Sequence, residues 1–165
     1  MYTQEITRKH RTAFVIAIDR SASMQEMTRM GRRRITKAQA VTLIASSLMQ
    51  EFIDRCRRTD SLRNYYDIAI VGYGDDSVEM LLGDEGFVAI NRLAERQATP
   101  HKISFELWGE GGCRETVEQE VPLWFEPKAA GNTPLYEALV KIKDIVHQWC
   151  CEEQNAESFP PIVIK

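Results

Sequence analysis

The fold of this chain is decided by residues 13–24, AFVIAIDRSASM. Their first six residues form a continuous apolar run, which is typical of a strand covered on both faces in a parallel sheet. The run ends abruptly in the polar segment 19–23, DRSAS, where one carboxylate and two hydroxyls follow each other at alternate positions. We therefore expect an α/β fold and a loop of functional interest directly after its first strand.

The next segments complete a strand–helix–strand unit. Apolar residues recur with a helical period of 3.6 from Ile35 to Ile53. Residues 67–72, DIAIVG, predict a second buried strand with an apolar run at 68–71. The strand is closed by the turn signal GYGDD, in which we interpret Asp75 and Asp76 as turn residues. This order predicts two parallel neighbouring strands joined by a helical crossover. Basic residues precede the helical pattern, and we interpret them as its solvated start: Arg29, Arg32, Arg33, Arg34 and Lys37.

The second half of the chain has a weaker pattern. Residues 87–97 predict a short helix, and residues 102–108 and 115–125 alternate roughly about the turn GEGG at 109–112. We interpret the two alternating segments as a β-hairpin, inserted into the sheet or added at its edge.

A loop and a helix close the chain. Residues 127–134, PKAAGNTP, form the loop, and Pro134 fits the first position of a helix capped by Thr133. Apolar residues on one face carry this helix to about Cys151, and residues 162–164 open a third buried parallel strand.

Composition limits the class of protein. With 165 residues, a net charge of −3, 44% apolar and 27% charged residues, the chain is typical of one globular domain. Its longest apolar runs fall far short of the ~20 residues that cross a membrane, and no export signal opens it, so we expect a cytoplasmic protein with no membrane segment. The slightly acidic balance disfavours nucleic acid as a partner. The cysteines lack paired zinc-ligand spacing and predict reduced thiols: Cys56, Cys113, Cys150 and Cys151.

The polar loops after the predicted strands suggest a cation site. In open α/β sheets ligands bind beyond the carboxyl ends of the strands. Asp19, Ser21 and Ser23 alternate along an extended loop and can converge on one point, and a second loop, GNTP at 131–134, offers the hydroxyl of Thr133. A carboxylate with neutral hydroxyls is a hard oxygen ligand set that suits Mg²⁺ or Mn²⁺. The D-x-S-x-S pattern alone also occurs as an ordinary turn, but its place after a buried strand favours the metal site.

Other catalytic signatures are absent from the sequence. The three histidines are isolated, the glycine-rich turn at 109–112 is not a phosphate-binding loop, and no G-x-S-x-G elbow supports a serine nucleophile. We therefore expect a binding protein and not an enzyme.

The quoted stretches resemble a known family. AFVIAIDRSASM resembles the opening strand and first metal motif of von Willebrand factor type A (VWA) domains, and AGNTPLYEAL resembles their second motif. The resemblance covers almost the whole chain and implies one domain over residues 1–165, with a doubly wound (Rossmann-like), mostly parallel sheet flanked by helices. The family's third motif follows the next strand, so we expect that motif and the last strands to lie beyond Lys165.

The resemblance also implies a function. Ser21, Ser23 and Thr133 would bind Mg²⁺ or Mn²⁺ directly at a metal-ion-dependent adhesion site (MIDAS), with Asp19 acting through water. An Asp or Glu of a partner protein would fill the last position on the ion. Intracellular bacterial proteins of this type often act beside ATPases, kinases or phosphatases, which the resemblance suggests as partners. Two alternatives stay open: a metal-independent VWA-like scaffold that binds partners through the hairpin of residues 102–125, and a metal-assisted phosphohydrolase.

Overall fold

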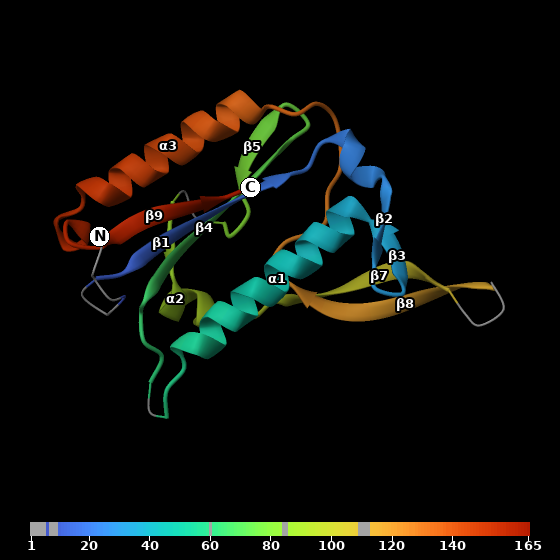
Figure 1. Ribbon diagram of the computed structural model, residues 1–165, viewed down its shortest axis with the longest axis horizontal. Coiled ribbons are helices and arrows are strands. Elements are labelled where there is room, and N and C mark those ends of the chain that lie inside the picture. Colours follow the sequence, from blue (N-terminus) through green and yellow to red (C-terminus); the bar gives the residue numbers. More distant parts are fainter. Residues whose placement is uncertain (1–5, 7–9, 60, 84–85, 109–112) are drawn as a thin grey trace.

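The computed structural model describes residues 6, 10–59, 61–83, 86–108 and 113–165, and within them it is a mixed α/β structure (Figure 1). One sheet is mixed, with strand order β5-β4-β1-β9 and β6 paired to β4, and a second sheet is antiparallel. The strands of the first sheet are β1 (Thr12–Asp19), β4 (Tyr66–Gly74), β5 (Ser77–Met80), β6 (Val88–Ala89) and β9 (Phe159–Ile164).

The centre of the mixed sheet is parallel. β1 pairs in parallel with β4 on one side and with β9 on the other, while β5 and β6 run antiparallel to β4. The parallel strands predicted from the three apolar runs are thus confirmed. Asp19 ends β1 opposite Tyr73 of β4, so the loops that leave these strands start at the same edge of the sheet.

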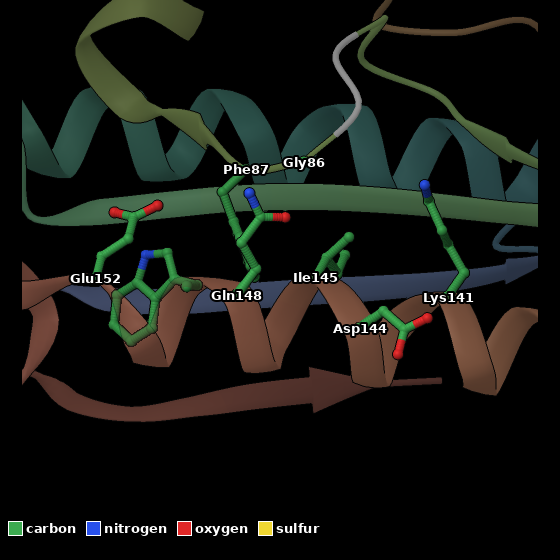
Figure 2. Close-up of a pocket in the computed structure, with 8 residues that line it drawn as sticks. Gly86, Phe87, Lys141, Asp144, Ile145, Gln148 and Glu152 are labelled. Atoms are coloured by element: carbon green, nitrogen blue, oxygen red, sulfur yellow. The ribbon is translucent and has the colours of Figure 1, made fainter.

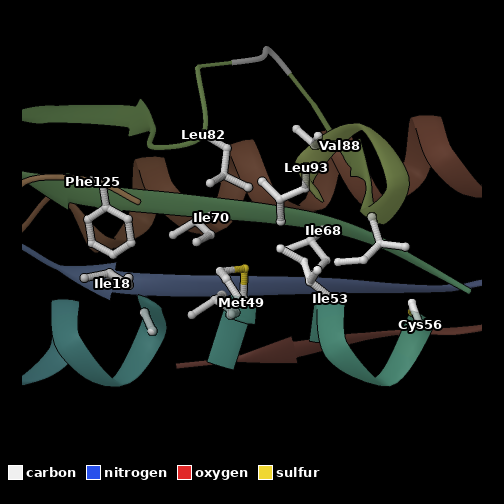
Figure 3. Close-up of a cluster of buried hydrophobic side chains, with 13 residues drawn as sticks. Ile18, Met49, Ile53, Cys56, Ile68, Ile70, Leu82, Val88, Leu93 and Phe125 are labelled. Atoms are coloured by element: carbon white, nitrogen blue, oxygen red, sulfur yellow. The ribbon is translucent and has the colours of Figure 1, made fainter. Parts of the chain in front are cut away.

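Two helices cover opposite faces of the mixed sheet (Figure 1). Because side chains alternate along a strand, Ile16 and Ile18 of β1 face α1 (Lys37–Cys56). Their neighbours Val15 and Ala17 face α3 (Leu135–Cys151). Figure 3 shows the core on the α1 side, where Met49 and Ile53 of the helix meet β1 and β4. Burial of these side chains accounts for the unbroken apolar runs in the sequence.

The start of α1 is fixed by a capping box. Thr36 Oγ1 accepts from Gln39 N at 3.1 Å, and Gln39 Oε1 accepts from Thr36 N at 3.0 Å, which satisfies two of the free amides at the helix start. The helix predicted from the pattern that begins at Ile35 therefore starts too early, because Ile35 belongs to the strand that precedes α1.

The start of α3 differs from the prediction. The helix begins at Leu135, one residue later than expected, and Pro134 is its N-cap. Pro134 has ψ 62°, outside the helical region, so the helix cannot include it. The prediction that Thr133 caps this helix was wrong.

The predicted hairpin is present but belongs to the second sheet. β7 (Thr99–Trp108) and β8 (Arg114–Leu123) pair along their whole length, and the predicted turn at 109–112 lies outside the described residues. β7 pairs with β3 (Arg33–Thr36), and β3 with β2 (Met27–Met30), so the hairpin is not at the edge of the mixed sheet. It has its own core against α1, which explains the separation: Ile35, Ala40, Ile103, Phe105 and Leu123.

Three of the basic residues, Arg29, Arg33 and Arg34, lie on this second sheet, which corrects their interpretation. Arg32 lies in the turn between β2 and β3, and Lys37 begins α1 as expected. Arg29 pairs with Arg34 across β2 and β3, and Arg34 contacts Glu106 at 3.3 Å. Arg33 stacks 4.5 Å from the ring centroid of Phe105. A carboxylate and an aromatic face thus compensate two of these charges.

β9 is parallel as predicted but not buried, because it is the last strand of the described sheet. Ile162, Val163 and Ile164 are 38%, 49% and 42% exposed. The short helix predicted over 87–97 is smaller, α2 (Ile90–Glu95). In the described part of the chain, no helix combines the length and apolar character needed to cross a membrane.

Candidate metal centre

The first predicted loop turns sharply after β1. Asp19 Oδ1 accepts a hydrogen bond from Ser21 N at 2.8 Å, and Ser21 Oγ lies 3.2 Å from Ser23 Oγ. Ser21 is buried, whereas Ser23 is exposed. The backbone is extended at Ser21 and then enters a short 3₁₀ helix, η1 (Ala22–Gln25), so the loop is less extended than its alternation suggests. The two hydroxyls meet nonetheless.

The second predicted loop is bonded to the first through the backbone. Ala22 N donates to Gly131 O at 3.0 Å, and Ala130 N donates to Arg20 O at 2.9 Å. Thr133 follows Gly131 by two residues and is exposed. Two segments more than 100 residues apart in the sequence therefore meet at the edge where β1 ends.

A third segment, the turn between β4 and β5, completes the edge. Asp75 and Asp76 are turn residues as predicted, with φ of 52° and 55°. Asp75 N donates to Ala130 O at 2.9 Å, and Asn132 Nδ2 donates to Asp76 Oδ1 at 3.2 Å. The turn thus holds the loop that carries Thr133 from its other side.

The hydroxyl of Tyr73 is a buried group near Asp19, on a residue whose sequence context indicates only a packing role. Tyr73 is 1% exposed, and its hydroxyl has no hydrogen-bond partner. Burial raises the pKa of this phenol, and the negative charge of Asp19 raises it further. A buried polar atom without a partner in the protein is commonly completed by a water or an ion.

The side chains of Asp19, Ser21, Ser23 and Thr133 offer the kind of oxygen atoms that a hard divalent cation prefers. One carboxylate and three hydroxyls supply oxygen atoms with little total charge, which suits an ion that keeps several of its own waters. Among the described residues, no three His, Cys, Asp or Glu side chains come together as a metal-binding group.

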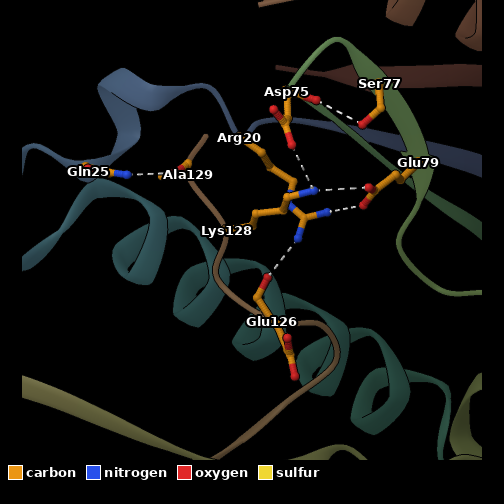
Figure 4. Close-up of polar contacts among 9 residues, drawn as sticks. Arg20, Gln25, Asp75, Ser77, Glu79, Glu126, Lys128 and Ala129 are labelled. Atoms are coloured by element: carbon orange, nitrogen blue, oxygen red, sulfur yellow. Dashed lines mark hydrogen bonds and ion pairs between the residues drawn. The ribbon is translucent and has the colours of Figure 1, made fainter. Parts of the chain in front are cut away.

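Beside these loops lies a buried arginine that sequence reasoning missed. Arg20 is 8% exposed, and it donates to Glu79 Oε2 at 2.6 Å and to Glu126 O at 3.3 Å (Figure 4). Burial alone would raise the pKa of Glu79, but the charges and hydrogen bonds of Arg20 and Lys128 outweigh it and lower that pKa. An arginine in a loop is exposed by default, so no sequence signal marked this one.

A groove of about 350 Å³ lies along α3, between the helix and the segment of Gly86 and Phe87 (Figure 2). Lys141, Asp144 and Glu152 contribute charges to its wall. None of the described residues that line it carries a hydroxyl, thiol or imidazole, so it offers no nucleophile of those kinds.

Comparison of the chain with protein-family models, with curated proteins and with solved structures gave no match. The assignment of this edge therefore depends on the residues and geometry described above.

Proposed function

We propose that this chain is a VWA-type domain that recognises another protein through Mg²⁺ or Mn²⁺. In this proposal the hydroxyls of Ser21, Ser23 and Thr133 hold the ion, and Asp19 supports it through water. The bound ion supplies an open position that accepts an Asp or Glu side chain of the partner, so affinity depends on the metal.

The observation that carries the proposal is the contact between the first motif loop, residues 19–23, and the second motif loop, residues 127–134. Ser21 and Ser23 place their hydroxyls 3.2 Å apart, and the backbone bonds from Ala22 to Gly131 and from Ala130 to Arg20 hold the Thr133 loop against them. The central parallel strands β4-β1-β9 and the helices on both faces of the sheet also agree with the doubly wound VWA fold. Ligand sites of such sheets lie at this edge.

Recognition fits these residues better than catalysis. A metal-assisted phosphohydrolase needs a general base or an activated nucleophile near the ion. Asp19 already accepts the amide of Ser21, and Asp75 and Asp76 are bound into their turn by Lys128 and Asn132. We therefore propose a binding protein, cytoplasmic as expected from its composition, that acts beside ATPases, kinases or phosphatases.

The alternative of a metal-independent scaffold has one observation in its favour. The β7–β8 hairpin projects beyond α1 (Figure 1), and most of β8 is exposed. A partner could pair with or lie on this hairpin without any ion. The two functions differ in their dependence on metal.

Protein capture from a cell lysate tests the proposal. The chain is immobilised, and captured proteins are identified by mass spectrometry in Mg²⁺ and in EDTA, with Thr133→Ala and the control Thr116→Ala, an exposed threonine of β8. We expect one set of proteins to be lost both in EDTA and with Thr133→Ala but retained with Thr116→Ala. Capture that survives EDTA and Thr133→Ala would support the scaffold instead.

A further inference from the structure

We propose that Arg20 is a positioning residue of the metal centre, through which the three segments at this edge are held in register. The inference depends on the proposed function, because it concerns the affinity of the same cation site. Arg20 carries a positive charge and cannot itself bind a cation, so its effect is exerted through the loops.

The guanidinium of Arg20 reaches two segments from a third. Nη1 donates to Glu79 Oε2 of β5 at 2.6 Å, and Nη2 donates to Glu126 O, in the loop that leads to Thr133, at 3.3 Å. Arg20 itself lies between Asp19 and Ser21, so any shift of its backbone moves both metal-site residues. One side chain thus joins the first motif loop, β5 and the segment just before the loop of residues 127–134 (Figure 4).

The backbone of Arg20 is held as firmly as its side chain. Its amide donates to Tyr73 O at 2.8 Å, and its carbonyl accepts from Ala130 N at 2.9 Å. A Cβ at Gly74 would lie 2.4 Å from Arg20 O, and a Cβ at Gly72 would lie 2.8 Å from Arg20 Cδ. Glycines in β4 therefore provide the space in which this arginine lies across the strand.

The ion pair extends to the second motif loop through Lys128. Its Nζ contacts Glu79 Oε1 at 3.4 Å and Asp75 Oδ2 at 3.9 Å. Glu79 is thus shared by Arg20 and Lys128, and Arg20 is the buried member of the group, with 10% of its side chain exposed. Without the Arg20 side chain, Glu126 O loses its donor and Glu79 keeps only the more exposed Lys128, while the backbone bonds of Ala130 and Gly131 to the first loop remain. We therefore expect the start of the loop that carries Thr133 to be held less closely to the loop of Ser21 and Ser23.

The fold offers a matched control for the test. Arg11 is also a mostly buried arginine with two partners, since it donates to Asp67 Oδ1 at 3.1 Å and to Asn155 Oδ1 at 3.2 Å. It precedes β1, whereas Arg20 follows it, so Arg11 lies at the opposite end of the strand from the motif loops. Loss of Arg11 should destabilise the fold without moving those loops.

The experiment measures the Mn²⁺ dissociation constant by calorimetry and the free energy of unfolding in EDTA for the wild type, Arg20→Met, Arg20→Lys and Arg11→Met. We expect Arg20→Met to weaken Mn²⁺ binding by about 10- to 100-fold, as substitutions behind metal ligands commonly do. Arg20→Lys keeps the charge but cannot reach two partners as a planar fork does, so its affinity should be intermediate. Arg11→Met should lower the free energy of unfolding and leave the Mn²⁺ affinity unchanged.

Three results would overturn the inference. Unchanged Mn²⁺ affinity in Arg20→Met would show that the loops keep their register without this side chain. Equal losses of affinity in Arg20→Met and Arg11→Met would show an effect of stability alone. If Arg20→Met does not fold, wild-type Mn²⁺ affinity in Arg20→Lys would likewise overturn the inference. A wild type that binds no Mn²⁺ would instead contradict the proposed function itself.

Discussion

Asp19 holds the amide of Ser21 with its side chain, at 2.8 Å from Oδ1 to the backbone nitrogen. This bond bends the chain immediately after β1 and brings the hydroxyl of Ser21 toward that of Ser23. The carboxylate therefore shapes the loop and also supplies the one negative charge of the proposed D-x-S-x-S ligand set. These two roles can be separated, because an amide oxygen can accept the same hydrogen bond without a charge.

Asp19→Asn separates them. The asparagine oxygen should keep the bond to Ser21 N, so we expect the free energy of unfolding in EDTA to stay near the wild-type value. Loss of the charge should weaken Mn²⁺ binding by about 10- to 100-fold. Calorimetry and denaturant unfolding on the same samples measure both quantities, and unchanged Mn²⁺ affinity would remove Asp19 from the centre.

Gly131 packs closely against the β4–β5 turn. Its φ is +59°, and a Cβ there would lie 2.5 Å from the Cα of Asp75. Gly31 has a similar φ of +63°, but a Cβ there meets nothing within 4 Å. A side chain at either glycine would thus meet the same strain from the left-handed backbone, but only at Gly131 would it also clash with a neighbouring residue.

Alanine at these positions measures the clash. Gly31→Ala should cost about 1–2 kcal/mol of unfolding free energy from the left-handed backbone alone. Gly131→Ala should cost more, since the backbone of Asp75 must shift, and it should also weaken Mn²⁺ binding. Denaturant unfolding of both variants gives the comparison, and equal costs would show that the loop has room to move.

The elements buried on both faces could be predicted from the sequence. Residues 13–18 and 68–71 are unbroken apolar runs because helices cover both sides of β1 and β4, and the period of α1 and α3 reflects their packed faces. The end of β1, and with it the place of Asp19, followed from the same pattern.

The errors have local physical causes. Thr133 was predicted to cap α3 because a threonine followed by a proline is a common helix start. Pro134 has a non-helical ψ, so the helix begins one residue later and Pro134 is its N-cap. The basic residues looked like a solvated helix start because pairing of Arg34 with β7 depends on residues about 70 positions away. Arg20 could not be found for the same reason, since both side-chain partners are distant in sequence.

Asp67 is a carboxylate buried at the other end of β4. It accepts from Trp149 Nε1 at 2.9 Å and pairs with Arg11 at 3.1 Å. Burial raises the pKa of Asp67 above its usual 3.8 and outweighs the lowering effects of the Trp149 hydrogen bond and the Arg11 charge. The folded state therefore binds this proton more tightly than the unfolded state does.

This difference predicts a pH dependence of stability. The contribution of Asp67 to the free energy of unfolding is fully present below pH 3.8 and is lost as the pH rises through the higher folded pKa. Asp67→Asn lacks this titration. From pH 3.8 up to the folded pKa, the free energy of unfolding of the wild type should therefore fall relative to that of Asp67→Asn, and at higher pH the difference between the two should stay constant. Denaturant unfolding at a series of pH values tests this, and a wild type that gains on the variant with rising pH would contradict it.

The cysteines differ in accessibility. Cys56 is fully buried at the end of α1, and burial raises the pKa of its thiol, whereas Cys113, Cys150 and Cys151 are exposed. We expect a disulfide exchange reagent at pH 8 to modify the three exposed thiols quickly and Cys56 only after unfolding. Mass spectrometry of the labelled protein identifies the sites, with Cys56→Ala as the control, and rapid native labelling of Cys56 would contradict the packing of α1.

The central claim is that Asp19, Ser21, Ser23 and Thr133 form a site for a divalent cation. Calorimetric titration of the wild type, Thr133→Ala and Thr116→Ala with Mg²⁺ and Mn²⁺ tests it most directly. We predict saturable binding to the wild type and to Thr116→Ala, and a large loss of affinity in Thr133→Ala. Absence of binding in the wild type, or equal binding in Thr133→Ala, would contradict the claim.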